Sequence, residues 1–382
     1  MRIIWKLVIF FLIISLLAAH TPQKTSASIG VSAQSAILME QSSGRVLYEK
    51  DAHTKRRIAS ITKIMTAILA IESGKMNQYV KVSEKATHAE GSSIYLKPGE
   101  KIKLKDLVYG LMLRSGNDAA VAIAEFVGGS TDGFVYLMNQ KAREIGMFDT
   151  HFANPHGLDD HEDHYSTAYD MALLMRYAMK NKTFAKISGT KEYRAPNPTE
   201  AWDRIWKNKN RLLTMYSYCT GGKTGFTKRA KRTLVTTATK GDMNLIAVTL
   251  NDPDDWKDHT AMFEAGFKQY EMAEILQKGK IDVNNKYYKN LYIKQSLDYP
   301  ATKEEMSLFS VKFKLDKPSS NWRKVLKKES IVGKAIAYLD GKAIMETPIY
   351  YANTERSKER KKGLFDFVKE IFLAVLGLTT DG

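Results

Sequence analysis

Apolar and polar residues follow two different rhythms along this chain. Near the start, AILMEQSSGRVLYEKD alternates as two short strands around Ser42-Ser43-Gly44, which predicts a hairpin. Apolar residues then recur at helical spacing, with Ser166 expected to cap the last helix beside Asp170. This spacing predicts helices at residues 61–72, 105–113, 119–126, 132–146 and 167–180.

Strand character returns later in the chain. Residues 233–239 and 244–250 are rich in β-branched side chains, and a Lys-Gly-Asp turn separates them. Residues 256–277 then predict a closing helix. Strands at both ends with helices between them predict one antiparallel sheet carrying an inserted helical subdomain. We therefore expect an α+β or mixed α/β fold for residues 28–277.

The composition changes again after residue 278. LYIKQSL, SVKFKL and VGKAIAYLDGKAIMETPIYY alternate, and Asp340-Gly341 marks a hairpin, so residues 278–355 predict a small all-β domain. In residues 356–382, the basic run RSKERKK precedes GLFDFVKEIFLAVLGL, whose apolar residues recur at helical spacing. We expect an amphipathic C-terminal helix that lies on an anionic membrane surface. The alternative is a helix that packs on the protein's own domain.

The first 27 residues read as an export signal. Arg2 and Lys6 precede a long apolar stretch, and the small residues Thr25-Ser26-Ala27 suit a signal peptidase. An uncleaved N-terminal anchor is the alternative. With either one, we expect the protein to be exported and to act at the outer face of the cytoplasmic membrane.

Composition narrows the function classes further. The single cysteine, Cys219, excludes an intrachain disulfide, so the fold must rely on its own core. The formal net charge is +16, and the signal contributes three of these positive charges. Such a surplus favours anionic surroundings, and export argues against nucleic acid as the partner.

The segment ASITKIMTAILAIE carries the first sign of chemistry. Ser60 and Lys63 lie three residues apart at the start of an apolar helix, so the amine can reach the hydroxyl. A serine needs a base to become nucleophilic, and a lysine can be that base if burial or another cation lowers its pKa. A simple helix cap is the ordinary alternative for such a serine.

Two later motifs strengthen the catalytic interpretation. Ser115-Gly116-Asn117 falls in a short break between two apolar helices, where a hydroxyl and an amide can project into a cleft. Lys223-Thr224-Gly225 is followed by strand-like sequence, and its glycine would let a substrate backbone approach a sheet edge.

With these motifs in this order, the sequence resembles the penicillin-binding proteins and serine β-lactamases. The resemblance covers nearly the whole chain, and its layout is similar to the low-molecular-mass D-alanyl-D-alanine carboxypeptidases of the peptidase S11 family. Among these it looks most similar to the sporulation-associated members of spore-forming bacilli. It implies a β-lactamase/transpeptidase-like domain, no cofactor and no metal. It also implies a peptidoglycan pentapeptide ending in D-Ala-D-Ala as substrate, and β-lactams as covalent inhibitors.

The resemblance also implies roles for individual residues. Ser60 would be acylated, Lys63 would take its proton, Ser115 would relay a proton to the leaving D-alanine, and Asn117 would orient Lys63 and the substrate amide. Lys223 would keep Lys63 neutral and attract the terminal carboxylate. The substrate-binding strand would also contribute Thr224 to the carboxylate, Gly225, and the backbone N–H of Phe226, which would form an oxyanion hole with that of Ser60.

The chain departs from the family pattern on both sides of the third motif. Relatives often carry an acidic and an aliphatic residue before the lysine, where this chain has Thr220, Gly221 and Gly222. Lys231 stands where a glycine is common, and Arg232 beside it is a candidate for holding the substrate carboxylate.

Several alternatives remain open from the sequence. Four histidines interspersed with acids in residues 151–164 suggest a zinc peptidase, although His-Glu-x-x-His is absent. Cys219 is expected to be a packed residue, and Trp202 and Trp206 either line a groove or pack. A β-lactamase would need a Glu-x-x-Leu-Asn loop, which is absent between Ser115 and Lys223. A penicillin sensor or wall-binding module without catalysis, and an endopeptidase, also remain.

Overall fold

The computed structural model describes residues 29–197, 200–288, 290–318 and 329–352. The predicted signal peptide and the predicted C-terminal amphipathic helix lie outside the described residues. None of the described helices is both long and apolar enough to cross a membrane.

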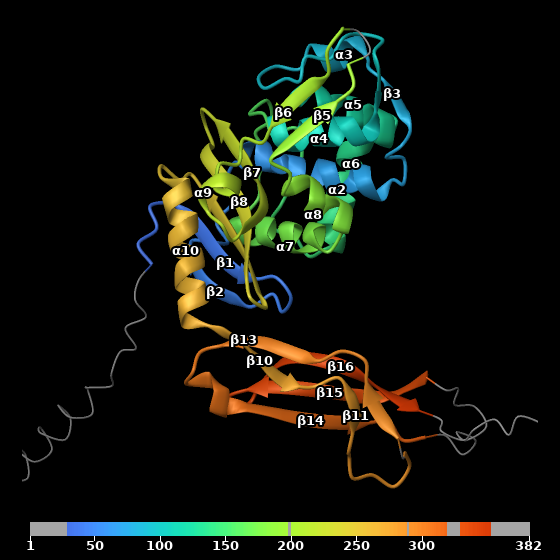
Figure 1. The fold of residues 1–382 in the computed structure, drawn as a ribbon, viewed down its shortest axis with the longest axis vertical. Coiled ribbons are helices and arrows are strands. Elements are labelled where there is room, and N and C mark those ends of the chain that lie inside the picture. Colours follow the sequence, from blue (N-terminus) through green and yellow to red (C-terminus); the bar gives the residue numbers. More distant parts are fainter. Residues whose placement is uncertain (1–28, 198–199, 289, 319–328, 353–382) are drawn as a thin grey trace, which may run out of the picture.

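An antiparallel sheet built from the two ends of the first domain, residues 29–269, forms the centre of that domain, as predicted (Figure 1). The N-terminal hairpin pairs with the late strands through β1 and β9, and β7 forms one edge of the sheet. In spatial order the strands are β2 (Val46–Lys50), β1 (Ser35–Glu40), β9 (Met243–Leu250), β8 (Lys231–Lys240) and β7 (Cys219–Thr227).

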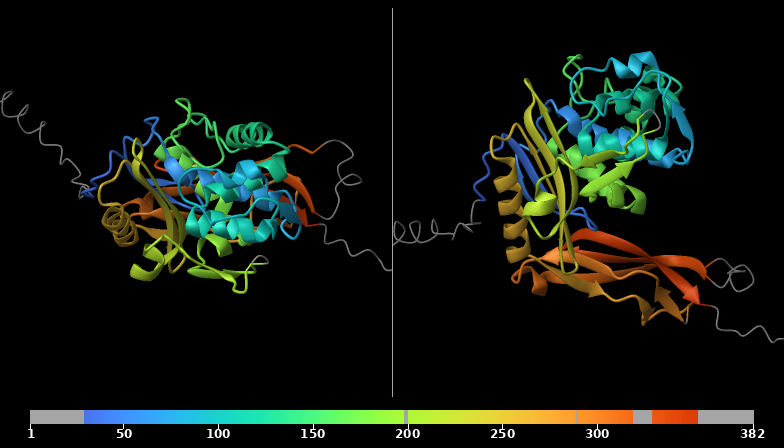
Figure 2. Two further views of the ribbon diagram at one scale, coloured as in Figure 1. Left: turned by 90° about the horizontal axis from the view of Figure 1, so that it is seen from above. Right: turned by 45° about the horizontal axis from the view of Figure 1, so that its top comes forward.

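Both faces of the sheet are covered, which explains why β1 is buried along its whole length. Ile37 and Met39 face the helical core, whereas Leu38 packs against α10 (Asp255–Gln269) on the other face. This alternation is the two-residue period of a strand. Figure 2 shows α10 on one side of the sheet and the remaining helices of the domain on the other.

The inserted helical subdomain surrounds α2 (Lys63–Glu72), which is apolar on nearly every side and almost completely buried. A 3-10 turn at Ala59–Thr62 leads into it. The neighbouring helices are α4 (Leu104–Arg114), α5 (Asn117–Gly128), α6 (Thr131–Glu144), α7 (Ala168–Met179) and α8 (Lys182–Ser188). Shorter elements complete the subdomain, namely α3 (Glu84–Thr87), α9 (Leu212–Met215), the hairpin of β3 (Tyr79–Lys81) and β4 (Lys101–Lys103), and the hairpin of β5 (Glu192–Ala195) and β6 (Arg204–Lys207).

Two local predictions are wrong. Thr167, and not Ser166, caps α7 by accepting a hydrogen bond from the Asp170 backbone N–H. Ser166 is fully buried, and its hydroxyl instead lies 2.7 Å from the Thr150 hydroxyl. The closing helix ends at Gln269, and the chain continues as β10 because this segment pairs with a distant strand.

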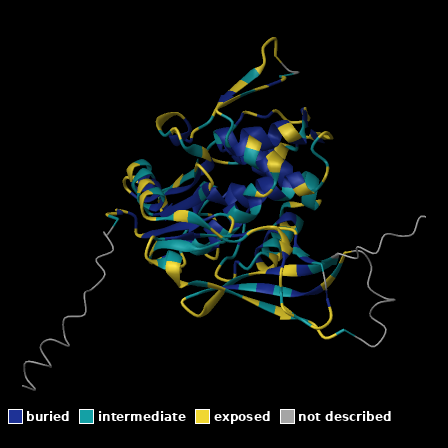
Figure 3. Cartoon of the chain, turned by 60° about the horizontal axis from the view of Figure 1, so that its bottom comes forward, coloured by how far each residue is buried: buried dark blue, intermediate teal, exposed yellow. Residues whose placement is uncertain are grey.

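A second domain follows α10, and it is all-β as predicted, with the Asp340-Gly341 turn joining its two long strands. Figure 3 shows that buried residues concentrate in the helices and the central sheet, whereas this domain is smaller and more exposed. Its strands are β10 (Glu271–Leu276) paired with β13 (Leu297–Ala301), and a sheet of β11 (Gly279–Ile281), β12 (Leu291–Ile293), β16 (Lys342–Ala352), β15 (Glu329–Leu339) and β14 (Phe309–Leu315).

Arg45 joins the two domains. From the hairpin beside β2, its guanidinium makes two hydrogen bonds, of 2.6 and 2.9 Å, to the Glu305 carboxylate. It also donates to the Pro300 carbonyl oxygen and lies over the rings of Tyr270 and Tyr299. Bidentate geometry, charge and aromatic contact together make this a specific connection.

Candidate active site

Ser60 and Lys63 lie at the junction between the sheet and the helical subdomain. Ser60 is in the 3-10 turn, and Lys63 is the first residue of α2. Lys63 Nζ donates a hydrogen bond of 2.8 Å to Ser60 Oγ and one of 2.6 Å to the His156 carbonyl oxygen. Ser60 makes no cap hydrogen bond through its side chain, so the simple capping role does not apply to it.

The environment of Lys63 favours a neutral amine. The side chain is completely buried, and this burial is the main reason why its pKa lies well below the ordinary value. The positive charges of Lys223 and Lys209 lower the pKa further, whereas Asp118 acts in the opposite direction. A neutral amine 2.8 Å from a hydroxyl can accept its proton.

Ser115 connects the second motif to the third. It ends α4 in a left-handed conformation, with φ of 64°. Lys223 Nζ donates to Ser115 Oγ at 3.1 Å and to the Thr224 carbonyl oxygen at 2.7 Å. Burial, followed by the charge of Lys209, lowers the pKa of Lys223 to about 7. The two buried amines and two hydroxyls therefore form two hydrogen-bonded pairs, close enough for the charge of Lys223 to lower the pKa of Lys63.

Asn117 is the first residue of α5, and its hydrogen bonds fix the backbone of residues 90–92 beside it. Its backbone N–H donates to the Ser92 carbonyl oxygen at 2.7 Å, and its side-chain Nδ2 donates to the Glu90 carbonyl oxygen. Its Oδ1 is buried and accepts no hydrogen bond within the described structure. Such an atom is costly unless a ligand completes it, so Asn117 Oδ1 is available to a substrate amide. Its hydrogen bonds run to the 90–92 backbone and not to Lys63.

The edge strand β7 passes close to the turn that carries Ser60. A Cβ atom at Gly225 would lie 2.9 Å from the Ser60 backbone nitrogen, so only glycine lets the strand approach Ser60 this closely. Thr224 is half-buried and Phe226 is largely exposed on the same strand. Because the outer edge of β7 has no partner strand in the described part of the chain, a peptide can pair with it.

The structure explains the residues that depart from the family pattern before the lysine. A bulge in β7 falls between Cys219 and Gly221. A Cβ at Gly221 would lie 2.4 Å from Ser188 Oγ, and one at Gly222 would lie 2.4 Å from the Val235 carbonyl oxygen. Because these two positions carry no side chain, β7 can pack closely against α8 and β8.

The departures after the motif concern backbone and charge. Lys231 has φ of 59°, the left-handed region that glycine adopts without steric cost. Arg232 is engaged elsewhere, because its Nη2 donates to Asp255 Oδ1 at 2.6 Å and its guanidinium lies over Trp256. The guanidinium is thus held by α10, which weakens its candidacy for binding the substrate carboxylate.

Two contributions to the site escaped the sequence analysis. Lys209, in the Asn-Lys-Asn run after β6, donates to Ser92 Oγ at 3.1 Å and lowers the pKa of both Lys63 and Lys223. The His156 carbonyl oxygen holds the Lys63 amine. Neither contribution belongs to a recognisable motif. The two asparagines that flank Lys209 were the only feature of the sequence that could have drawn attention to this lysine.

The described contacts of the histidine-rich loop, residues 151–164, are structural ones. Burial lowers the pKa of His164 to about 3, and its Nε2 lies 2.9 Å from Thr62 Oγ1. Across residues 29–197, 200–288, 290–318 and 329–352, the side chains form no group of three or more His, Cys, Asp or Glu that could hold a metal ion. Burial raises the pKa of the Cys219 thiol to about 11, so it is a poor nucleophile.

Comparison with known proteins identifies the family. The D-alanyl-D-alanine carboxypeptidase model of peptidase S11 matches residues 20–254, and the C-terminal domain model of penicillin-binding protein 5 matches residues 270–356. The chain belongs to the peptidase S11 family of D-alanyl-D-alanine carboxypeptidases.

Named relatives agree with this assignment. The chain is 35% identical to the D-alanyl-D-alanine carboxypeptidase DacF of Bacillus subtilis, over 91% of this chain and 90% of that protein. It is 31% identical to DacA of Escherichia coli, over 90% and 88%. Penicillin-binding protein 5 from Haemophilus influenzae has a similar structure, with a TM-score of 0.71 and 28% identity over 85% of this chain and 97% of that one.

The charge of Lys209 generates a prediction about pH dependence. With Lys63 as the base and Lys223 as the cation that binds the carboxylate, we expect an acid limb from the titration of Lys63 and an alkaline limb near pH 7 from that of Lys223. Lys209→Met removes a charge that lowers both pKa values, so both limbs are expected to move to higher pH. The measurement is the rate of acylation by a fluorescent penicillin against pH. Lys207→Met is the control, and limbs that stay in place in Lys209→Met would contradict the assignment.

Backbone strain at Lys231 generates a second prediction. Lys231→Gly is expected to raise the free energy of unfolding by about 1 kcal/mol, because glycine removes the left-handed steric cost. Urea unfolding followed by circular dichroism measures the change. Lys228→Gly in the same turn has no positive φ to relieve and is expected to give no gain. Equal effects of the two substitutions would show that φ at Lys231 is not the cause.

Proposed function

We propose that the protein removes the terminal D-alanine from peptidoglycan stem pentapeptides through an acyl-enzyme on Ser60. One observation carries this proposal. Lys63 is a completely buried amine with a strongly lowered pKa, and its Nζ lies 2.8 Å from Ser60 Oγ. Membership of the carboxypeptidase family supports the choice of substrate.

Acylation follows from these positions. Ser60 Oγ attacks the carbonyl carbon between the two D-alanines while its proton passes to Lys63. Backbone N–H groups of Ser60 and Phe226 stabilise the negative oxygen of the tetrahedral intermediate. The C–N bond then breaks, and the leaving amine of D-alanine receives the proton that Lys63 had taken, relayed through Ser115, which leaves Lys63 neutral again.

The remaining residues position the substrate. The peptide lies along β7, with its terminal carboxylate near Lys223 and Thr224 and its amide at Asn117 Oδ1. Water then attacks the acyl carbonyl carbon while its proton passes to neutral Lys63, the bond to Ser60 Oγ breaks, and Lys63 returns the proton to Ser60 Oγ as the shortened peptide leaves. A β-lactam presents a similar amide, but its ring-opened product stays attached and blocks Ser60.

The alternative functions are less well supported. A sensor or wall-binding module without catalysis has no need of an activated serine–lysine pair, and the named relatives are carboxypeptidases. Trimming the pentapeptide limits crosslinking, since the terminal D-Ala-D-Ala bond supplies the energy for it. The resemblance to sporulation-associated members suggests the spore cortex as one place of action.

The direct test is release of D-alanine from a peptide ending in L-Lys-D-Ala-D-Ala by the full chain in detergent. Wild type is expected to release D-alanine, and Ser60→Ala is expected to lose at least about 10³-fold of the rate. A chelator should leave the rate unchanged. Release that survives Ser60→Ala and stops with chelator would replace this mechanism with a metal-dependent one.

We also propose that the protein is exported and held at the outer face of the cytoplasmic membrane. The sequence of residues 1–27 and the basic, apolar pattern of residues 356–382 support this. The full chain is expected to bind vesicles containing anionic lipid and to be released by truncation after residue 355. Equal binding of the full and truncated chains would refute the proposed anchor.

A further inference from the structure

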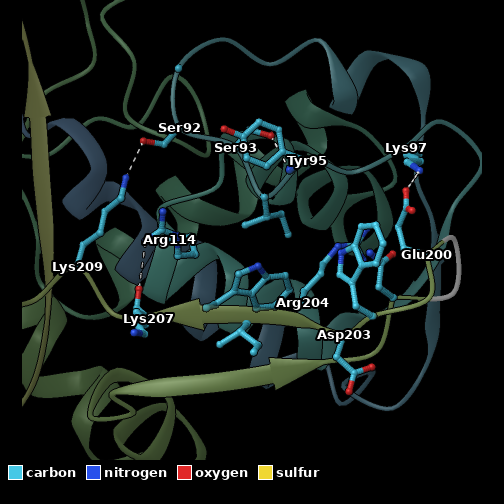
Figure 4. Close-up of a pocket in the computed structure, with 16 residues that line it drawn as sticks. Ser92, Ser93, Tyr95, Lys97, Arg114, Glu200, Asp203, Arg204, Lys207 and Lys209 are labelled. Carbon is cyan, nitrogen blue, oxygen red and sulfur yellow. Dashed lines mark hydrogen bonds and ion pairs between the residues drawn. The ribbon is translucent and has the colours of Figure 1, made fainter.

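A groove of about 870 Å³ lies beside the catalytic cleft and is not used by the reaction described above. The 91–97 segment forms one wall, and the β5–β6 hairpin with the residues after it forms the other (Figure 4). Trp206 packs at its base, whereas Trp202 is exposed at its side. Of the two roles expected from the sequence, packing applies to Trp206, and both tryptophans line the groove.

The inner end of the groove shares residues with the active site. Ser92 accepts a hydrogen bond from the Asn117 backbone N–H through its carbonyl oxygen, and its Oγ accepts one from Lys209 Nζ. Lys209 also lowers the pKa of Lys63 and Lys223. A peptide bound with its scissile bond at Ser60 and its amide at Asn117 can therefore continue into this groove.

Two of the basic residues in the groove are already neutralised. Lys97 Nζ lies 2.5 Å from the Glu200 carboxylate. Arg204 makes hydrogen bonds of 2.6 and 3.0 Å to Glu100. Figure 4 shows the Lys97–Glu200 pair at the end of the groove away from Lys209.

The other three basic residues lie toward the active site and have no acidic partner among the described residues. Arg114 donates only to the Lys207 carbonyl oxygen, at 3.4 Å, and Lys209 donates to Ser92. Figure 4 places Arg114, Lys207 and Lys209 together at this end. Three uncompensated cations in one groove create a potential that favours an anion.

The middle and outer parts offer apolar contact. Tyr95 is 82% exposed and Trp202 is 67% exposed, and both line the groove with Ile205. Exposed aromatic rings at a groove provide rigid surface for the backbone and methyl groups of a ligand. The groove therefore suits an extended peptide that carries a negative charge near its reactive end.

We propose that this groove binds the part of the stem peptide that precedes D-Ala-D-Ala, and that Arg114, Lys207 and Lys209 recognise a free carboxylate on it. This subsite rests on the proposed carboxypeptidase function. The carboxylate comes either from a γ-linked D-glutamyl residue or from a diaminopimelic residue at the third position. The enzyme thereby prefers acidic stems to amidated ones.

The experiment compares three pentapeptides with the full chain in detergent. The first is L-Ala-γ-D-Glu-L-Lys-D-Ala-D-Ala, and the second replaces D-glutamate with D-isoglutamine, which removes only the charge. The third combines D-isoglutamine with diaminopimelate. We expect at least one carboxylate-bearing peptide to exceed the fully amidated lysine peptide about fivefold or more in kcat/KM for D-alanine release. The peptide that is preferred identifies the source of the carboxylate.

Salt and variants test the cause of the preference. The preference is expected to shrink in 0.5 M NaCl, about the concentration at which exposed charges are strongly screened. Arg114→Gln/Lys207→Gln is expected to lose it, whereas Lys97→Gln, whose charge is already neutralised, is expected to keep it. Lys209 stays unchanged because its charge also acts on the catalytic lysines. Labelling of Ser60 by a fluorescent penicillin verifies that each variant is folded.

The outcomes separate the two proposals. Equal rates for all three peptides in the wild type would overturn the subsite and leave the carboxypeptidase intact. A preference that resists both salt and the double substitution would also overturn the role of the cations. No release from any peptide would overturn the proposed function, and the subsite with it.

Discussion

The structure depends on the burial of two lysine amines in one cleft. Taking an amine out of water is costly, and two of them repel each other. The protein offsets part of this cost with hydrogen bonds from Lys63 to Ser60 and His156, and from Lys223 to Ser115 and Thr224. The remaining cost lowers the pKa values of both amines, and for Lys63 this is the property that the proposed chemistry needs. The helices around α2 exclude water and so maintain this state.

Backbone conformations that ordinary residues avoid hold the amines in place. Ser115 is left-handed at the end of α4, and its hydroxyl faces Lys223 as a result. At Gly157, a Cβ atom would lie 1.9 Å from the Ala59 carbonyl oxygen, so this loop presses against the turn that carries the nucleophile. Gly225 likewise lets strand β7 approach the backbone of the same turn closely. Strain of this kind is found where function requires a close approach.

The periodicity predicted the central sheet and the main helices, and the motifs selected side chains that the structure joins in two hydrogen-bonded pairs. Ser60 and Lys63 are neighbours within one helical turn, so local sequence was sufficient for that pair. Lys209 was missed because its position depends on the β5–β6 hairpin, which short-range periodicity did not indicate. Residues 271–276 contain good helix formers, yet they form β10 because a partner strand is available far along the chain. Ser166 and Thr167 are equally good caps by sequence, and only the burial of Ser166 decides between them.

The connection at Arg45 has a mechanical consequence. A guanidinium held by one carboxylate, one carbonyl and two rings restricts the angle between the domains. The helical subdomain lies at the end of the molecule away from the β domain (Figure 1). The β domain is therefore a rigid extension of the first domain, held at a restricted angle to it. The distance from the far end of the β domain to β7 is thereby fixed, so the enzyme meets its surroundings at a constant reach from that end.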